Sequence, residues 1–382
     1  MAPLPAEAVR VVTYLLLLAS VLGLAYLAVA NAVVFAFARR SVPQPAHFPS
    51  VTVLKPVSGL EPELYENLAT FCEQDYPEFD VIFCVHDRRD AAVAVIERVI
   101  AAFPACAAQI LAGDDRAHRN PKIANLAKGA AAARGDLIVI ADSDIRVGPA
   151  YLRSLAASFA RERTGAATCL YRAVAAGGFV PQLGAAYVED QFAPSVLVAA
   201  TLGTMRFCLG STMAVRRSLL DAAGGIGALG AYLADDHRLG ELVTERGFQV
   251  ELSRYVVATT IPETTLRDLW SHELRWARTN FVLAPAGYIF SFLTFGAPLA
   301  LLYLLVSRDA RVGFPLLAAA IALRFALHYT ARAALGVRRA PAPWIAPIRD
   351  LWSLALWLAS LFGRTVRWRQ SRVAVDSAGR MR

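Results

Sequence analysis

Long apolar runs lie towards the two ends of the chain, and shorter runs alternate with polar stretches between them. Residues 11–38 contain no charged side chain. At about 1.5 Å rise per residue, a helix of this length exceeds a bilayer core of about 30 Å. A cleaved signal peptide has an apolar region of only about 7–15 residues, so the run predicts a membrane anchor instead. Arg39 and Arg40 follow at once, and the positive-inside rule places that end in the cytoplasm.

The middle of the chain, residues 49–280, has an ordinary balance of polar and apolar residues and predicts a cytoplasmic domain. Its short apolar runs and its helix-like stretches alternate along the chain, at 51–57, 80–87, 91–103, 120–134 and 137–144. Strands that alternate with helices predict an α/β fold, with a mostly parallel sheet covered by helices on both faces. Ligands of such sheets bind outside the carboxyl ends of the strands. Four aspartates that follow apolar runs should gather at that edge: Asp87, Asp90, Asp142 and Asp144.

The C-terminal third is apolar again and predicts two more spans, at 285–306 and 313–335. A further stretch, 347–363, carries an uncharged run of only 13 residues. This run is short for a span and suits an interfacial or re-entrant helix. A third crossing would place the basic tail 364–382 outside, against the positive-inside rule. We therefore expect a multi-pass protein of the inner (cytoplasmic) membrane, with its catalytic domain and tail in the cytoplasm.

Composition supports this membrane assignment. Hydrophobic residues make up 56% of the chain and charged residues only 18%, which is too apolar for an ordinary soluble enzyme. The formal net charge of +8, beside so many apolar runs, favours anionic lipids or a phosphate-bearing substrate over nucleic acid. The five cysteines form no CxxC pair and no zinc spacing with histidines. They are interpreted as reduced thiols of a cytosolic domain.

The stretch "VIADSDIRV", residues 139–147, ends an apolar strand with two carboxylates, Asp142 and Asp144. Such a DxD sequence offers the hard oxygen ligands that Mg²⁺ or Mn²⁺ binds together with substrate phosphates. The cation would neutralise a diphosphate leaving group. DxD alone is weak evidence, because any turn or helix N-terminus can contain it.

Neighbouring motifs strengthen the hypothesis. In "RNPKIANL", Lys122 could meet a phosphate or the nucleotide. In "YLADDHRLG", Asp235 and Asp236 stand where a general base is needed, although one of them could instead cap a helix. "HELRWAR", residues 272–278, combines basic and aromatic side chains just before the membrane. Its alternative interpretation is an interfacial anchor belt.

In this order and spacing, the motifs resemble the ceramide glucosyltransferase family of membrane-bound, inverting glycosyltransferases. That family has the GT-A fold and a D, D, D, (Q/R)xxRW pattern. The resemblance runs from about residue 50 to 280 and includes "LKPVSGLEPELYENLATFCEQDYPEFDVIFCVHDRRD". It implies that Asp90, with Asp87 beside it, lies in the nucleotide site. It also implies that Asp142 is the second aspartate and Asp236 the catalytic base.

The last motif of the family matches with one departure. Arg275 and Trp276 match its RW pair, whereas His272 stands where the family has Gln or Arg. Histidine can donate to a phosphate or hydroxyl, but its neutral form supplies no positive charge, which puts that role in doubt. "HELRWAR" and "ADSDIRV" look similar to the bacterial branch that glycosylates hopanoid lipids.

The resemblance and the apolar flanks together predict transfer of one sugar from a UDP-sugar, UDP-glucose or UDP-N-acetylglucosamine, to the hydroxyl of a membrane lipid. The acceptor would be a hopanoid polyol or ceramide. The apolar stretch 192–215 predicts a core strand and helix with a lipid-facing surface, or alternatively a further span. Two other functions stay open: a processive polysaccharide synthase, which normally needs more spans, and a non-catalytic nucleotide-binding membrane protein.

Overall fold

The computed structural model describes residues 5–41, 47–113, 118–175, 177–338, 341–362, 365–368, 371–374, 376 and 379–381. The chain divides into two compact units, which we call the sheet unit and the helical unit. The sheet unit comprises Arg40–Val174, Thr204–Pro262 and Gly379–Arg382, and the helical unit comprises Met1–Arg39, Ala175–Gly203 and Glu263–Ala378. The domain predicted over 49–280 is therefore divided between the units, because Ala175–Gly203 and the stretch from Glu263 onwards belong with the long apolar helices.

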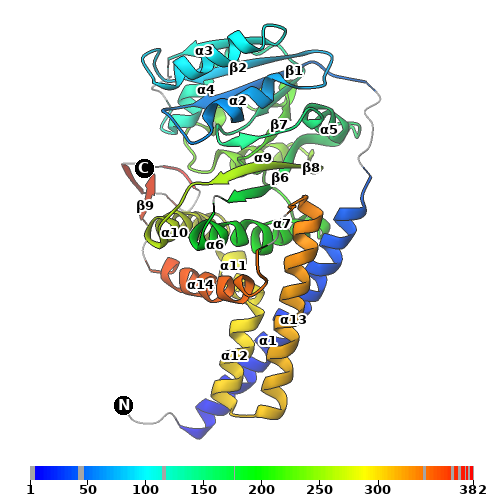
Figure 1. The fold of residues 1–382 in the computed structure, drawn as a ribbon, viewed down its shortest axis with the longest axis vertical. Coiled ribbons are helices and arrows are strands. Elements are labelled where there is room, and N and C mark those ends of the chain that lie inside the picture. Colours follow the sequence, from blue (N-terminus) through cyan, green and yellow to red (C-terminus); the bar gives the residue numbers. More distant parts are fainter. Residues whose placement is uncertain are drawn as a thin grey trace. The chain divides into compact units, whose positions relative to one another are not determined.

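The sheet unit is built on one eight-stranded sheet with the order β3-β2-β1-β4-β7-β6-β8-β5 (Figure 1). β1 pairs in parallel with β2 and β4, and β2 with β3, whereas β7 and β5 pair antiparallel with their neighbours β4, β6 and β8. The expected α/β class is confirmed, with a mixed sheet in which the neighbouring strands β3, β2, β1 and β4 run parallel. The strands are β1 (Val51–Val57), β2 (Phe79–Val85), β3 (Ala107–Ala112), β4 (Leu137–Ile140), β5 (Ile145–Arg146), β6 (Thr164–Ala175), β7 (Met213–Arg216) and β8 (Gln249–Ile261).

Helices cover both faces of this sheet because its parallel strands are apolar on both sides. Along β2, Val81 and Phe83 pack in one core with side chains of α2 and α3. Ile82 and Cys84 face the other way, towards Gly129 of α4, where an added Cβ would lie 2.4 Å from the Cys84 sulfur. The helices are α2 (Leu64–Cys72), α3 (Ala92–Ala102), α4 (Pro121–Ala132), α5 (Tyr151–Ser158), α8 (Arg217–Ala222) and α9 (Asp235–Glu245), with a 3₁₀ turn at Ile226–Leu229.

The C-terminal residues 379–381 complete the sheet unit as a short antiparallel partner of residues 231–233. The Leu233 N–H donates to the Gly379 carbonyl at 3.0 Å, and the Met381 N–H donates to the Ala231 carbonyl at 2.9 Å. The Arg119 guanidinium donates to the Met381 carbonyl at 2.8 Å. This segment therefore lines the loop that leads into α9.

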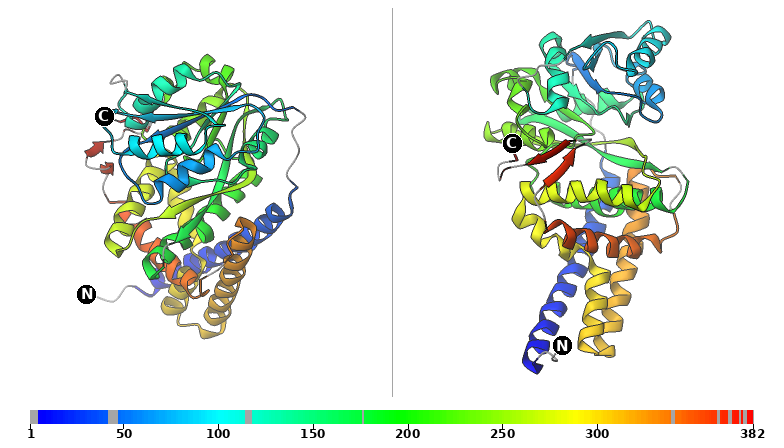
Figure 2. Two further views of the ribbon diagram at one scale, coloured as in Figure 1. Left: turned by 45° about the horizontal axis from the view of Figure 1, so that its top comes forward. Right: turned by 90° about the vertical axis from the view of Figure 1, so that its left-hand side faces the viewer.

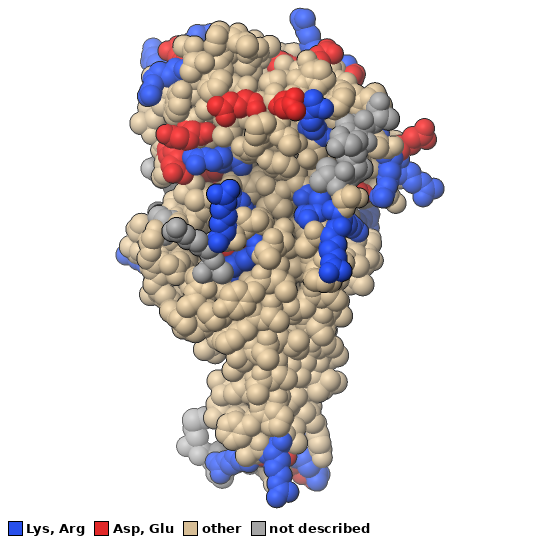
Figure 3. All heavy atoms as spheres, turned by 45° about the vertical axis from the view of Figure 1, so that its right-hand side comes forward, with Lys and Arg blue, Asp and Glu red and all other residues tan. Residues whose placement is uncertain are grey.

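The helical unit combines a bundle of α1, α12 and α13 with helices α6, α10 and α14, which lie across one end of that bundle (Figures 1 and 2). Figure 3 shows an uncharged band along the visible face of the bundle and charged side chains at its far end. The helices are α1 (Ala6–Arg39), α6 (Phe179–Tyr187), α7 (Ala193–Thr201), α10 (Leu266–Leu283), α11 (Pro285–Phe290), α12 (Gly296–Ser307), α13 (Ala310–Leu335) and α14 (Ile345–Ser360). A π turn lies at Val188–Phe192 and a 3₁₀ turn at Ser291–Thr294. β9 (Thr365–Trp368) and β10 (Ser371–Ala374) form a hairpin.

Among the described residues, α1 and α13 are long and apolar enough to cross a membrane, and the bent pair of α11 and α12 would make a third span. The stretch predicted as one span at 285–306 is therefore not one continuous helix, since it bends by 68° between Pro285–Thr294 and Gly296–Ser307. Directly after the break, α12 packs closely against α1. A Cβ added to Gly296 would lie 2.9 Å from Leu27 Cδ1 of α1.

Two further expectations concern apolar stretches outside these helices. The stretch 192–215 forms α7 and then β7, a helix and a core strand. α14 covers most of the stretch predicted as an interfacial or re-entrant helix, 347–363. Its Arg349 and Asp350 are buried among polar partners of the helical unit. α14 is thus polar on its inner side rather than apolar all round.

Candidate functional site

Asp142 and Asp144 follow β4 at its carboxyl end, as the sequence predicts. The side chain of Asp142 is 38% exposed. Asp144 accepts a hydrogen bond from the Thr259 hydroxyl of β8 at 2.7 Å. Burial, followed by the charge of Asp142, raises the pKa of Asp144. The two carboxylates repel one another, so nearby positive charge is needed to keep both ionised.

Lys55 supplies one of these positive charges from beneath the sheet edge. It is fully buried on β1 and donates to the Asp142 carbonyl at 2.5 Å. Its ammonium group lies 3.8 Å from the centroid of the Phe71 ring, in a cation–π contact. Burial lowers the pKa of Lys55 to about 7, although Asp144 and Asp142 oppose the shift. The lysine therefore fixes the backbone of the DxD loop.

Lys122 supplies the second positive charge and links two motifs. Its ammonium nitrogen lies 2.7 Å from Asp142 Oδ1 and 3.0 Å from Asp235 Oδ2. Asn120 caps α4 by accepting a hydrogen bond from the Lys122 N–H, and Pro121 occupies the first helical position. The cap therefore fixes the position of Lys122 in the first turn of the helix. Burial would lower the pKa of Lys122, but Asp142 and Asp235 together raise it above its usual value. Lys122 thus stays charged between the two carboxylates.

Asp236 is the better placed of the two adjacent aspartates to act as a base. Asp235 is buried and paired with Lys122, whereas Asp236 is partly exposed and accepts the His237 N–H at 2.8 Å. A Cβ added to Gly210 would lie 3.2 Å from Asp142 Oδ2 and 3.5 Å from Asp236 Oδ2. Burial and the charge of Asp235 raise the pKa of Asp236 to about 6. A carboxylate with this pKa can take up a proton near neutral pH.

Asp87 and Asp90 follow β2 at the same edge of the sheet. The Asp90 carboxylate accepts the Gly59 N–H at 2.9 Å and the Ala92 N–H at 2.9 Å. Gly59 has a φ of +70°, which favours glycine, so Asp90 holds a tight loop after β1. Asp87 is exposed and caps Arg89 through a 2.9 Å bond. Asp90 therefore organises the loop after β1.

The donor set at the end of β4 fits a divalent cation that binds together with a diphosphate. Asp142 and Asp144 offer hard carboxylate oxygens, which Mg²⁺ and Mn²⁺ prefer. Oδ2 of Asp142 faces Gly210, where the missing side chain leaves room that a Cβ would take. Among the described residues there is no cluster of three His, Cys, Asp or Glu that could hold an ion without substrate. Substrate oxygens would therefore have to complete the coordination.

The HELRW residues lie on α10, which belongs to the helical unit. His272 forms an ion pair with Glu263 through Nδ1. The His272 ring centroid lies 4.2 Å from that of Trp276, and the Trp276 ring stacks on Tyr187 at 5.7 Å. Burial lowers the pKa of Arg275, against the opposing charge of Glu263. Nδ1 of His272 thus has a carboxylate partner, Glu263.

Several contacting residues were missed by the sequence reasoning. Thr259 binds Asp144, and Glu61 accepts from the Ser143 hydroxyl inside the DxD motif at 2.6 Å. Gly210 leaves space between two carboxylates, and nothing in its local sequence marks it. Lys55 did give a signal, because a charged residue inside the apolar run "VTVLKPV" needs a partner when buried.

Comparisons with known proteins agree on one family of enzymes. Residues 15–381 match the family model described as Glycosyl transferase family 21. Ceramide glucosyltransferase 1 of Caenorhabditis elegans is 28% identical over 238 residues, which are 62% of this chain and 51% of that protein. The ceramide glucosyltransferase of Komagataella phaffii is 39% identical over 113 residues, 28% of this chain and 22% of that protein. The chain spans about half the length of the first of these relatives, and less of the second.

Solved structures resemble the chain more distantly. A mannosyltransferase from Pyrobaculum calidifontis, solved in complex with GDP-Man and Mn²⁺, has a TM-score of 0.49 at 18% identity and covers 90% of this chain and 94% of its own. Glucosyl-3-phosphoglycerate synthase from Mycobacterium tuberculosis, also solved with Mn²⁺, has a TM-score of 0.39 at 18% identity, with coverages of 61% and 79%.

Proposed function

The chain belongs to glycosyl transferase family 21, and from this premise we propose that it transfers one sugar from a UDP-sugar to the hydroxyl of a membrane lipid, with inversion. The proposed donor is UDP-glucose or UDP-N-acetylglucosamine, and the proposed acceptor is ceramide or a hopanoid polyol. The proposed location is the inner (cytoplasmic) membrane, with the sheet unit in the cytoplasm. One observation carries the proposal: Asp142 and Asp236 approach the same glycine, so a leaving-group carboxylate and a base carboxylate border one space.

The chemistry follows from these positions. Asp236 accepts the proton of the acceptor hydroxyl, while the oxygen of that hydroxyl forms a bond to the anomeric carbon of the sugar. The bond between that carbon and the diphosphate breaks, and the electron pair leaves with the diphosphate. Lys122 stabilises the phosphate charge that develops. Asp142 and Asp144 would hold Mg²⁺ or Mn²⁺, which neutralises diphosphate charge when bound.

The remaining site residues keep the roles that the family pattern implies. Arg275 would stabilise phosphate charge, and Trp276 would pack on the sugar or the lipid. His272 would act through its pair with Glu263 rather than on a phosphate. Asp90, with Asp87, would serve the nucleotide through the loop held by Gly59.

The two alternatives differ in their support. Membership of a glycosyltransferase family favours an enzyme over a purely nucleotide-binding protein. A processive polysaccharide synthase needs enough spans to surround a polymer. The described residues supply two or at most three helices that could cross a membrane, which supports transfer of a single sugar to a lipid.

Reconstitution would test the proposal. The protein in lipid vesicles would receive each UDP-sugar with either ceramide or a hopanoid polyol, and lipid products would be identified by mass spectrometry. One glycolipid of defined mass should form, and Asp236→Asn should lower its rate by at least about a hundredfold, the scale of general-base catalysis. A ladder of products with increasing sugar number would instead indicate a processive synthase. Full activity of Asp236→Asn would reject the assigned base.

A further inference from the structure

Glu273 is the residue that follows His272 in HELRW, and its carboxylate is fully occupied inside the helical unit. Its side chain is 4% exposed. The two terminal nitrogens of Arg349, on α14, donate to its two oxygens at 2.8 and 2.9 Å. The indole N–H of Trp352 donates to Oε2 at 2.8 Å. This bidentate pair with a third donor fixes both the position and the plane of the carboxylate.

Arg349 also supports the aromatic end of the same motif. Its guanidinium carbon lies 5.0 Å from the centroid of the Tyr187 ring on α6. The same ring stacks on Trp276 at 5.7 Å, with an interplanar angle of 26°. Arg349 therefore supports α10 at two positions. It binds Glu273 directly, and it supports Trp276 indirectly through the Tyr187 ring. Arg275 lies between these two anchored residues.

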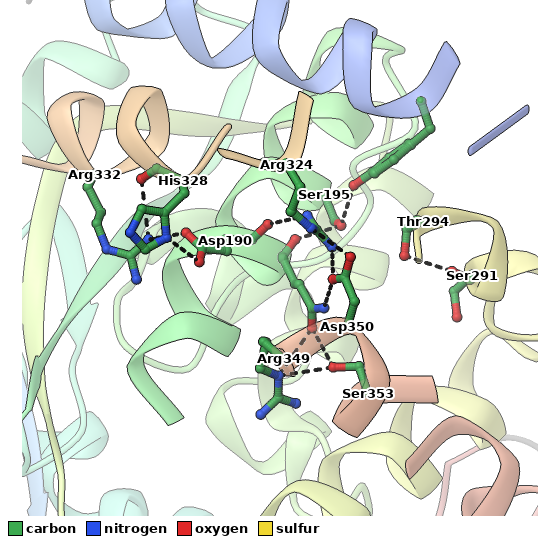
Figure 4. A network of polar contacts seen from close by, with 12 residues as sticks. Asp190, Ser195, Ser291, Thr294, Arg324, His328, Arg332, Arg349, Asp350 and Ser353 are labelled. Carbon is green, nitrogen blue, oxygen red and sulfur yellow. Dashed lines mark hydrogen bonds and ion pairs between the residues drawn. The ribbon is translucent and has the colours of Figure 1, made fainter. Parts of the chain in front are cut away.

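Arg349 is itself held by a buried polar network (Figure 4). Its Nε donates to the Ser353 hydroxyl at 3.0 Å, and that hydroxyl donates to Gln191 of the π turn at 2.6 Å. Gln191 donates to Asp350 at 2.8 Å, and Asp350 pairs with Arg324 of α13. The Arg349 guanidinium is thus held both by Glu273 of the HELRW motif and by the network through Ser353 and Gln191.

Stability alone gives little reason for this arrangement. Replacing a buried ion pair with apolar residues of similar volume is often neutral or stabilising. A bidentate pair instead fixes direction, which apolar packing does not. On α10, Leu269 and Glu273 are the buried residues, one helical turn apart. The pair therefore determines which way the helix is rotated about its axis, and with it the direction of Arg275.

We propose that Glu273 and Arg349 form a positioning pair that orients Arg275 and Trp276 for sugar transfer. The inference rests on the proposed function, because it assigns those two residues a part in the reaction. Neither member of the pair touches the reacting atoms. Loss of the pair should lower kcat and leave the KM for the UDP-sugar largely unchanged, because the helix rotates while the nucleotide loops of the sheet unit are unaltered.

Two kinds of variant separate orientation from stability. Glu273→Leu combined with Arg349→Met removes both charges together, and should keep the unfolding temperature while lowering kcat by about ten- to a hundredfold, the scale of a small misplacement. Arg349→Lys keeps the charge and loses the bidentate geometry, and should also lower kcat. Arg153→Lys is the matched control: Arg153 of α5 holds the Asp75 carboxylate through two nitrogens, in the sheet unit and outside this network. Its kcat should stay within about twofold of wild type.

A second measurement needs no substrate. Backbone amide hydrogen exchange at 272–278 should be faster in Arg349→Lys than in wild type and unchanged in Arg153→Lys. Wild-type exchange in Arg349→Lys, or a double variant with more than half of the wild-type kcat, would overturn the inference. If wild type forms no glycolipid from the proposed substrates, the proposed function fails, and the exchange rates alone decide whether the pair positions the motif.

Discussion

The ammonium nitrogen of Lys122 lies 3.0 Å from the carboxylate of Asp235. This ion pair gives the two adjacent aspartates at the start of α9 different surroundings. Asp235 is buried against a permanent positive charge, whereas Asp236 is partly exposed beside Gly210. One carboxylate is thus the structural partner of Lys122, and the other, with a pKa raised to about 6, is available for proton transfer.

The pH dependence of turnover should report on this arrangement. Asp236 must be ionised to accept a proton, so kcat should fall as the pH drops through about 6, the raised pKa of Asp236. Lys122 holds that pKa down, so Lys122→Met should raise it and move the acid limb to higher pH. Lys122→Arg should keep the limb near its wild-type position. The measurement is the pH profile of kcat with saturating donor and acceptor.

Lys128→Met is the control for that series, since this lysine of α4 donates only to the Ala112 carbonyl, at 3.2 Å, among the bonds described. Its profile should match wild type. An acid limb that does not move in Lys122→Met would show that the titrating group is not Asp236.

Metal dependence should follow from Asp142. Asp142→Asn should lower transfer by about a hundredfold or more, since several kcal/mol of charge stabilisation would be lost with the cation. The unfolding temperature should change little, because the side chain is 38% exposed. Asp136→Asn, at the other end of β4, where the carboxylate accepts from Ser50 at 2.9 Å, should leave turnover unchanged. Near-normal activity of EDTA-treated wild type would reject the metal assignment.

Gly210 offers a steric test of the space between the carboxylates. In Gly210→Ala, the new methyl group would lie 3.2 Å from Asp142 Oδ2 and 3.5 Å from Asp236 Oδ2. It would displace one of them by a few tenths of an ångström, and kcat should fall by about tenfold or more. Gly177→Ala, whose Cβ would meet nothing within 4 Å, is the control. Equal kcat values for the two variants would mean that no reacting group enters beside Gly210.

The orientation of α14 can be tested through the hairpin that follows it. Arg349 and Asp350 would each cost about 2.5–3.5 kcal/mol at the bilayer centre on insertion scales, so α14 should lie along the cytoplasmic face. A single cysteine at residue 371, in a protein freed of its native cysteines, should resist an impermeant maleimide in intact cells. It should react after permeabilisation. Labelling in intact cells would mean that α14 crosses the membrane.

Local sequence predicted the acidic edge of the sheet better than the helices around it. Parallel strands bring their carboxyl ends together whatever their loops do, so the strand pattern was enough to place Asp87 and Asp90 after β2 and Asp142 and Asp144 after β4. The bend inside 285–306 comes just before α12 packs on Leu27 of α1, far away in the chain, and hydropathy contains no such contact.

The polar contacts were harder to predict for the same reason. Glu273 reads as an ordinary surface residue in "HELRWAR", because its partner Arg349 follows 76 residues later. Lys55 was identifiable as unusual within its strand, but its acceptor, the backbone carbonyl of Asp142, carries no sequence signal. Long-range pairs of this kind become visible only when the fold brings their elements together.

The pairing of residues 379–381 with residues 231–233 bears on how the protein is prepared in the laboratory. Met381 is buried and bonded to Ala231, four residues before α9 begins at Asp235. An affinity tag fused to the C-terminus would extend from this strand, and a deletion from residue 379 onwards would remove it. Either change would disturb the backbone ahead of the base. An N-terminal tag leaves this strand intact, so preparations tagged at that end are the appropriate reference for every rate compared above.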